Sequence, residues 1–236
     1  MAGFQPRGGG KEKNFDLDNL ISKLESLKTL IVYDSLYASR SLLFHHILPQ
    51  FSSKNIFIAV YSDTMYRRLE KTYESILKTS PEVKKILEGA RIIKIGTKKE
   101  ISFGQLYKLV SGPSWLKPLT NIVRELSSKD LLLLHGFSII PVMYGQKGLR
   151  DVLRLLDSAH GDITVIGKCS EKLYSENTEK LLERFYDVVL EIKRTKGEFP
   201  GFEETYTVGV RQSILMDIRP GFGRFKIGDD GRLVEF

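Results

Sequence analysis

Short apolar runs separated by amphipathic segments fill most of the chain. Each run is almost continuously hydrophobic, which is typical of strands that are buried on both faces of a parallel sheet. The runs cover residues 29–33, 55–61, 91–95, 130–134, 162–166 and 188–192. Because helical segments alternate with them, the pattern predicts βαβ units and a three-layer α/β fold, with a mainly parallel central sheet and helices on both faces.

Residues that commonly cap helices precede several of the intervening segments. Asp16 opens a segment whose apolar residues continue at helical spacing to Leu27. Asp63 or Thr64 can cap a helix after the second strand, because a side-chain oxygen at that position accepts a free backbone N–H. Ser80 is followed by a proline, which is frequent at the first position of helices. These segments are the predicted helical layers.

The last part of the chain follows a different pattern. Residues 204–212 and 222–236 alternate polar and apolar positions, and Gly-Asp-Asp-Gly at 228–231 predicts a hairpin turn. We therefore expect antiparallel strands at one edge of the parallel core. The glycine-rich residues 1–13 are predicted to be a disordered tail, ahead of a single domain at 14–236.

Composition narrows the class of protein. The chain of 236 residues is 42% hydrophobic and 28% charged, an ordinary globular balance. No apolar run approaches the roughly 20 residues that cross a bilayer, and the first residues lack the apolar segment of a signal peptide. We therefore expect a cytoplasmic location and no membrane partner. Cys169 is the only cysteine, so an internal disulfide and a cysteine-based zinc site are excluded.

The chain is basic, with a net charge of +7 and a pI of about 9.3. Within residues 64–100, ten Lys or Arg residues stand against five Glu residues. This excess is consistent with a solvated helix face, and it also makes nucleic acid a candidate partner. The candidate contacts in this region are Arg67, Arg68, Lys71, Lys98 and Lys99.

The loop after the first strand lacks the residues of a phosphate-binding loop. In a nucleotide-binding α/β protein, glycines at this position let backbone N–H groups surround the phosphates, and a lysine contacts the terminal ones. From Asp34 to Ser41 the chain has neither a glycine nor a lysine. The sequence therefore predicts the strand, loop and helix of a nucleotide-binding site without the glycines and the lysine that usually bind the phosphates.

Local sequences further along the chain carry a family resemblance. Ser62-Asp63 follows the second strand, and residues 129–138, Lys-Asp-Leu-Leu-Leu-Leu-His-Gly-Phe-Ser, contain a strand that ends at His135. Residues 206–212 and 225–233 form the terminal strands and hairpin. The order of these elements and their local sequences resemble the RecA-like ATPases of the KaiC group, and in particular an archaeal type of KaiC-related protein. The resemblance covers residues from about 27 to 236. The resemblance implies a RecA-like core.

The chain departs from that family at both nucleotide motifs. Arg40 stands at or beside the position of the Walker A lysine, with Ser39 or Ser41 near the hydroxyl position. His135 stands where the Walker B aspartate would hold the hydration shell of Mg²⁺, and imidazole is a poor ligand for that hard cation. The resemblance therefore implies degenerate Walker motifs and a pseudo-ATPase without catalytic residues or a metal site. ATP is the disfavoured cofactor alternative.

Two sets of site residues follow. The candidates for nucleotide or anion binding are Ser35, Ser39, Arg40, Ser41, Asp63 and His135. Two of these have a competing structural interpretation, because Arg40 can be an exposed arginine that pairs with an acid, and Asp63 can be a helix cap. Arg211 joins the partner-binding candidates, since the KaiC group has basic residues in this stretch that reach phosphates of a neighbouring subunit.

The leading hypothesis is a non-catalytic RecA/KaiC-like domain that acts as a binding, regulatory or assembly module. Its expected partner is a protein, either a second copy of the chain or a related ATPase. Two alternatives remain open. One is a nucleic-acid-binding protein that uses the basic region 64–100, and the other is a divergent nucleotide-binding ATPase.

Overall fold

The computed structural model describes residues 15–76, 80–112, 114–195 and 204–236. The predicted tail, residues 1–13, lies outside the described residues.

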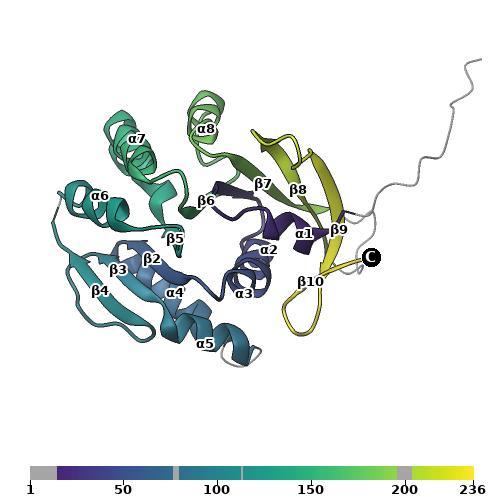
Figure 1. Cartoon of the computed structure of the whole chain (residues 1–236), viewed down its shortest axis with the longest axis horizontal. Helices are drawn as coiled ribbons and strands as arrows, with labels where there is room; N and C mark the ends of the chain where they lie inside the picture. The colour runs from purple at the N-terminus through teal and green to yellow at the C-terminus, as the bar shows by residue number, and fades with distance from the viewer. Residues whose placement is uncertain (1–14, 77–79, 113, 196–203) are drawn as a thin grey trace, which may run out of the picture.

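One ten-stranded sheet organises the described chain, in the order β10-β9-β8-β7-β1-β6-β5-β2-β3-β4 (Figure 1). The strands from β7 to β4 in this order are parallel, whereas β8, β9 and β10 extend the sheet antiparallel beyond β7. The bounds are β1 (Lys28–Tyr33), β2 (Asn55–Tyr61), β3 (Arg91–Ile95), β4 (Gln105–Val110), β5 (Asp130–His135), β6 (Thr164–Ser170), β7 (Val188–Thr195), β8 (Thr205–Ser213), β9 (Gly221–Ile227) and β10 (Leu233–Glu235). The predicted α/β fold with an antiparallel C-terminal edge is confirmed.

Two of the differences between the predicted and the observed strands, at β6 and β4, have a clear physical reason. β6 begins two residues later than predicted and continues to Ser170, because residues 160–163 form a turn and the strand then runs on through the charged Lys168. The sheet also contains β4, an edge strand that the hydrophobic pattern did not reveal. Its residues are mostly exposed or half-buried, since only β3 pairs with it. Edge strands carry a weak hydrophobic signal for this reason.

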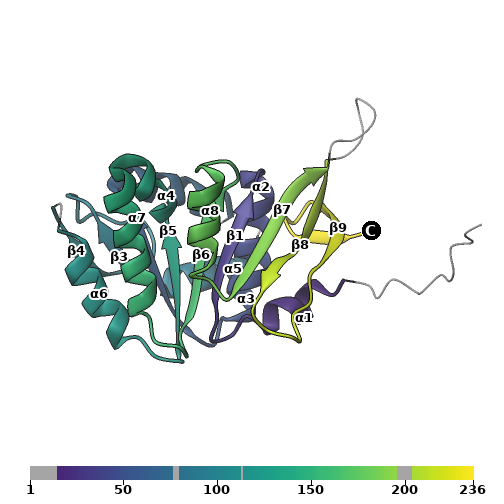
Figure 2. The same cartoon turned by 90° about the horizontal axis from the view of Figure 1, so that it is seen from above.

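Helices cover both faces of the sheet. One face carries α1 (Leu17–Ser22), α2 (Leu36–Ser41), the π-helix η1 (Leu42–Ile47), α3 (Leu48–Gln50), α4 (Asp63–Ile76) and α5 (Pro81–Gly89). The other face carries α6 (Leu116–Glu125), the 3₁₀ turn η2 (Phe137–Ile139), α7 (Ile140–Ser158) and α8 (Glu176–Glu183). Figure 2 shows α6, α7 and α8 side by side in front of the strands. Each face has its own apolar core, which explains why the central strands are hydrophobic at nearly every position.

The helix starts depend on short side chains. Asp16 accepts the N–H of Asn19 at 2.9 Å, and Ser80 accepts that of Val83 at 3.4 Å, as the sequence suggested. At α4 the prediction was wrong, because the hydroxyl of Ser62 accepts the N–H of Met65 at 3.2 Å. The backbone of Ser62 is left-handed, with φ 83°, at the turn from β2 into α4, and Asp63 is free for other contacts. The first helix is also shorter than expected, since α1 ends at Ser22 rather than near Leu27.

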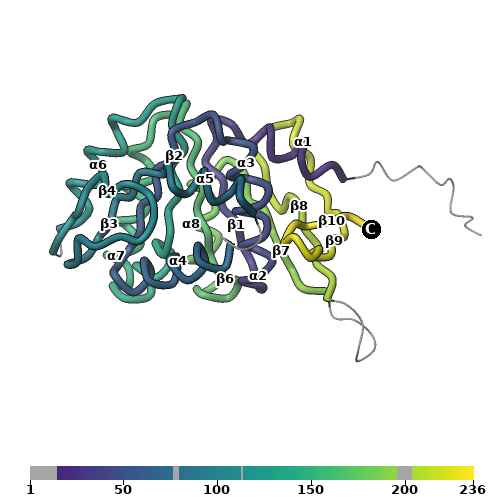
Figure 3. Tube along the Cα trace, turned by 90° about the horizontal axis from the view of Figure 1, so that it is seen from below, coloured from purple at the N-terminus to yellow at the C-terminus, as the bar shows by residue number. Residues whose placement is uncertain are grey.

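Two adjacent histidines fasten the C-terminal hairpin to the first helical layer. Both lie in η1, where the N–H of Leu48 bonds to the carbonyl of Leu43, five residues back. His46 Nε2 accepts the N–H of Leu233 at 3.0 Å, and His45 packs against Gly231 in the hairpin turn. Figure 3 follows this side of the molecule, where α2, β9 and β10 lie near one another.

Acid is expected to weaken this fastening. Burial lowers the pKa of His46, with Asp18 and Asp230 opposing that shift and Arg232 assisting it. The folded chain therefore takes up the proton at lower pH than the unfolded chain, and the free energy of unfolding falls as pH drops below about 6.5. In His46→Gln, which keeps an acceptor, urea unfolding at about pH 7.5 and about pH 5.5 should show a smaller loss. The exposed His160→Gln is the control, and an equal loss in His46→Gln and the unaltered chain would contradict the assignment.

Within the described residues, no helix combines the length and the apolar character needed to cross a membrane.

Candidate functional site

Three side chains line up where the central strands end. In the parallel pairing, Ile31 of β1 lies beside Lys168 of β6, and Leu134 of β5 lies beside Gly167. Lys168 and His135 are therefore the next neighbours in register, and Tyr33 lies two positions beyond Ile31. All three project to the face covered by α2 and α4, because side chains along a strand alternate between faces and Ile31 belongs to that core. Lys168 and His135 are half-buried.

Two arginines approach the same place from the helical layer. Arg40, in the last turn of α2, is half-buried, and Arg68 is exposed on α4. The ammonium group of Lys168 lies 5.2 Å from the ring centroid of Tyr33. We refer to Arg40, Arg68, His135 and Lys168 as the basic cluster.

The cluster members perturb one another. Burial, followed by the charge of Arg40, lowers the pKa of Lys168 to about 7. Burial lowers the pKa of His135 to about 3, and the charges of Lys168, Arg40 and Arg68 add to this shift. Burial and then Arg68 lower the pKa of Arg40. His135 is therefore a neutral imidazole at physiological pH, surrounded by cations.

No acid balances this charge within the described part of the chain. None of the described carboxylates forms an ion pair with a cluster member, and none is among the groups that shift the pKa values of Arg40, His135 and Lys168. Arg40 is thus half-buried and has no acidic partner among the described residues. Among those residues, no group of three or more His, Cys, Asp and Glu is placed to hold a metal ion.

The serines of residues 35–41, beside the basic cluster, form hydrogen bonds within the chain. Ser35 caps α2 by accepting the N–H of Ala38 at 3.3 Å, and its carbonyl accepts the N–H of Ser39. The hydroxyls of Ser39 and Ser41 donate to Leu36 O at 3.0 Å and to Gly231 O at 2.6 Å. Because α2 begins directly at Leu36, these N–H groups and hydroxyls serve the helix and the hairpin rather than an open cradle. The serines named from the sequence thus have structural partners.

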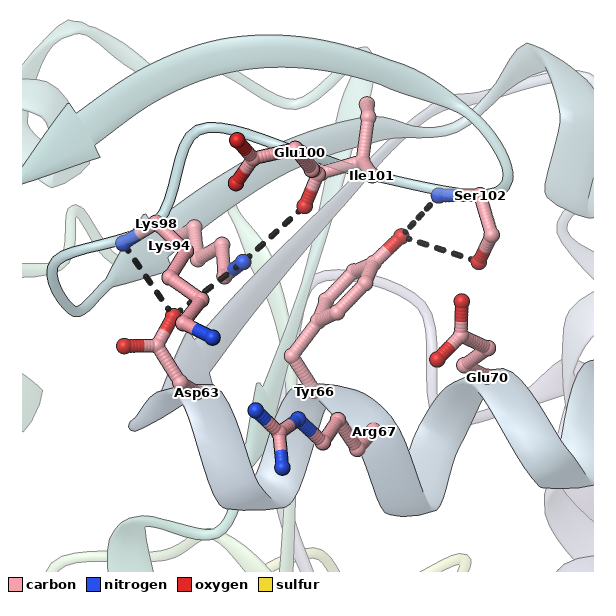
Figure 4. Close-up of a pocket in the computed structure, with 9 residues that line it drawn as sticks. All are labelled: Asp63, Tyr66, Arg67, Glu70, Lys94, Lys98, Glu100, Ile101 and Ser102. Atoms are coloured by element: carbon pink, nitrogen blue, oxygen red, sulfur yellow. Dashed lines mark hydrogen bonds and ion pairs between the residues drawn. The ribbon is translucent and has the colours of Figure 1, made fainter.

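Asp63 is committed to a separate pocket between α4 and the β3–β4 connection (Figure 4). Its carboxylate accepts the N–H of Thr97 at 3.0 Å and pairs with Lys94 at 3.2 Å. Lys94, whose side chain is 3% exposed, also donates to Glu100 O at 3.0 Å and lies 4.5 Å from the Tyr66 ring centroid. Burial alone would raise the pKa of Asp63, but these bonds outweigh it and hold that pKa low. The carboxylate therefore joins α4 to the β3–β4 connection instead of capping α4.

The pocket at Asp63 brings together two of the predicted partner-binding residues. Arg67 of α4 and Lys98 of the β3–β4 connection line the same cavity of about 320 Å³. Two more of these predicted residues, Lys71 and Lys99, are exposed and follow Arg67 and Lys98 closely in the sequence.

Arg211 lies elsewhere, on β8. It pairs with Glu179 at 3.1 Å and Glu183 at 3.2 Å, and it lies 3.7 Å from Glu191. These carboxylates raise its pKa against the effect of burial. Its charge is therefore already balanced inside the chain.

Sequence reasoning did not place Lys168 among the site residues, and it assigned Arg68 to contacts with nucleic acid or another partner. The available signal was a lysine inside an apolar strand, Val-Ile-Gly-Lys-Cys, which costs free energy unless the charge is used or paired.

Comparisons with known proteins identify the fold. No model of a protein family matches the sequence, and no curated protein matches it. Two solved structures from Pyrococcus horikoshii OT3 are similar. One is the protein PH0250, with 16% identity and a TM-score of 0.60 over 92% of this chain and 97% of that one. The other is the KaiC-like protein PH0186, from a hyperthermophilic archaeon, with 13% identity and a TM-score of 0.59 over 90% of each chain. The chain therefore has a KaiC-like RecA fold, with a mostly parallel central sheet and C-terminal antiparallel strands.

Proposed function

We propose that this chain is a non-catalytic KaiC/RecA-like module, a pseudo-ATPase that acts by binding a partner. The observation that carries the proposal is the chemistry of the strand ends. At β5 and β6 the side chains facing α2 and α4 are His135 and Lys168, with Arg40 and Arg68 above them and no described carboxylate paired to any of the four. Mg²⁺ requires hard oxygen ligands, and a group of cations repels it.

Two further features support the proposal. The turn into α2 has no glycine, and the N–H groups of Asp34, Ala38 and Ser39 bond within the chain, which argues against a backbone cradle for a nucleotide. Asp63 follows β2, where the KaiC-group ATPases that the sequence resembles have a catalytic carboxylate, and it is bonded to Lys94 and Thr97. A general base needs an accessible lone pair within reach of a water molecule, and these bonds occupy the carboxylate.

A hydrolysis assay tests this function. We expect no release of phosphate from ATP above the rate without protein, and no increase in ATP affinity when Mg²⁺ is added, measured by calorimetry. Asp63→Asn should leave this result unchanged, because the carboxylate has no catalytic role. Hydrolysis that requires Mg²⁺ and is lost in Asp63→Asn would refute the proposal and support the divergent ATPase.

The partner that we propose is a protein, either a second copy or a related ATPase. Nucleic acid is the second candidate, and the exposure of Arg67, Lys71, Lys98 and Lys99 along α4 and the β3–β4 connection favours it.

A further inference from the structure

The basic cluster gathers positively charged side chains without a described counter-ion, and packing does not explain this arrangement. Side chains from α2, α4, β5 and β6 bring Arg40, Arg68, His135 and Lys168 together without a described acid. Like charges in a half-buried place repel one another and lose hydration, so the arrangement destabilises the empty fold. Elsewhere the same chain pairs its buried charges, as it does for Lys94 with Asp63 and for Arg211 with Glu183. The described residues supply no counter-charge at the cluster, and a bound anion would provide one.

We propose that the basic cluster is a magnesium-independent binding site for a small phosphate anion with at least two negative charges, such as diphosphate. The inference rests on the proposed function, because it assigns a ligand to the place where hydrolysis is no longer supported. It differs from a phosphate loop in its donors, which are side chains of two helices and a strand rather than backbone N–H groups.

The donor set selects phosphate over a simple carboxylate. The guanidinium groups of Arg40 and Arg68 each offer several donors in one plane, which suits bidentate contact with phosphate oxygens. The ammonium of Lys168 adds a point charge from the sheet below, next to the hydroxyl-bearing ring of Tyr33. Donors that arrive from both the helical layer and the sheet match an anion with several oxygens pointing in different directions. A single carboxylate offers two oxygens and one charge.

Magnesium is unnecessary at such a site. In nucleotide-binding proteins the metal neutralises phosphate charge, and here three cationic side chains supply that charge directly. Burial, followed by the charge of Arg40, lowers the pKa of Lys168 to about 7. A fraction of the molecules therefore has a neutral Lys168 at physiological pH. A bound anion stabilises the ammonium form, so binding takes up a proton and the affinity should decline as pH rises above about 7.

Calorimetry and thermal unfolding with diphosphate in EDTA test the inference. We expect diphosphate to raise the melting temperature and to bind equally well with and without Mg²⁺. Arg68→Gln, which alters an exposed residue, and Lys168→Met should each weaken binding at least tenfold. Lys117→Gln removes an exposed lysine from α6, on the opposite face of the sheet, and should leave binding unchanged. ATP should bind comparably to diphosphate if its phosphates are the recognised part.

The outcomes separate this inference from the proposed function. If diphosphate neither binds nor stabilises the chain, or if Arg68→Gln and Lys168→Met bind it as the unaltered chain does, the anion site is refuted while the non-catalytic role stands. If diphosphate does not bind but a single-stranded oligonucleotide does, and Arg68→Gln and Lys168→Met weaken that binding, the cluster belongs to a nucleic-acid surface and the inference fails. Mg²⁺-dependent ATP hydrolysis with metal-free diphosphate binding intact would refute only the proposed function.

Discussion

Asp63→Ala is expected to lower the free energy of unfolding by about 2–3 kcal/mol, a large loss for a single polar side chain. Among the described residues, the change leaves the buried ammonium of Lys94 with the carbonyl of Glu100 and the face of Tyr66 as its remaining partners. It also removes the acceptor for the N–H and hydroxyl of Thr97. A buried charge that loses its partner costs more than the pair contributed, because its hydration is not restored. Urea unfolding monitored by circular dichroism measures the change.

Two further variants make this expectation specific to the buried pair. Glu176→Gln breaks an exposed pair with Lys180 on α8, and it should change stability little because solvent screens such pairs. The double variant Asp63→Ala/Lys94→Met should be more stable than Asp63→Ala alone, since the unpaired charge is gone. If Asp63→Ala costs no more than Glu176→Gln, the pocket drawn in Figure 4 does not depend on the ion pair.

Lys168→Met is expected to stabilise the chain in phosphate-free buffer by about 1–2 kcal/mol. Methionine keeps most of the length of the side chain, one heavy atom fewer, while it removes a charge that Arg40 repels and burial penalises. For a chain of this size, such a gain corresponds to a rise in melting temperature of roughly 2–8 °C. Differential scanning calorimetry measures it, and Lys117→Met on the exposed face of α6 is the matched control.

The gain should depend on pH in a defined direction. The pKa of Lys168 is about 7 in the fold and about 10.5 in the unfolded chain, so the unfolded chain binds the proton more strongly between these values. The penalty on the folded state is therefore complete below about pH 7 and disappears as pH approaches about 10.5. Lys168→Met should gain most at about pH 6 and little at about pH 10. A gain that is equal at both values would show that the charge of Lys168 is not responsible.

Hydrophobic spacing predicted the sheet better than it predicted the site. The runs at 55–61 and 91–95 are strands over the same residues, because burial on both faces demands apolar side chains at every position. β4 was not predicted from the hydrophobic pattern. An edge strand pairs with one neighbouring strand and is partly exposed, so it can contain residues such as Lys108 and Tyr107. The length of α1 was also misjudged, because Leu24 and Leu27 are apolar at helical spacing although the helix has already ended.

The candidate site was only half predictable. Motif positions pointed to Arg40 and His135, and the structure places them close enough for the charge of Arg40 to help lower the pKa of His135. Lys168 and Arg68 join them through strand register and through the packing of α4, and neither relation leaves a trace in the local sequence. The interactions of Asp63 could not be predicted from the sequence either. Its position after β2 suggested phosphate chemistry, whereas its partner Lys94 comes from the next strand and could not be identified without the fold.

The π-helix at Leu42–Ile47 has a consequence for comparing this chain with others. A π-turn closes its hydrogen bonds over one more residue than an α-turn does, so the segment holds one residue more per turn closed in this way. An alignment that treats residues 36–50 as one uninterrupted α-helix will be displaced by one position after Leu42. In related sequences, the counterparts of His45 and His46 should therefore be sought with a one-residue gap at this point.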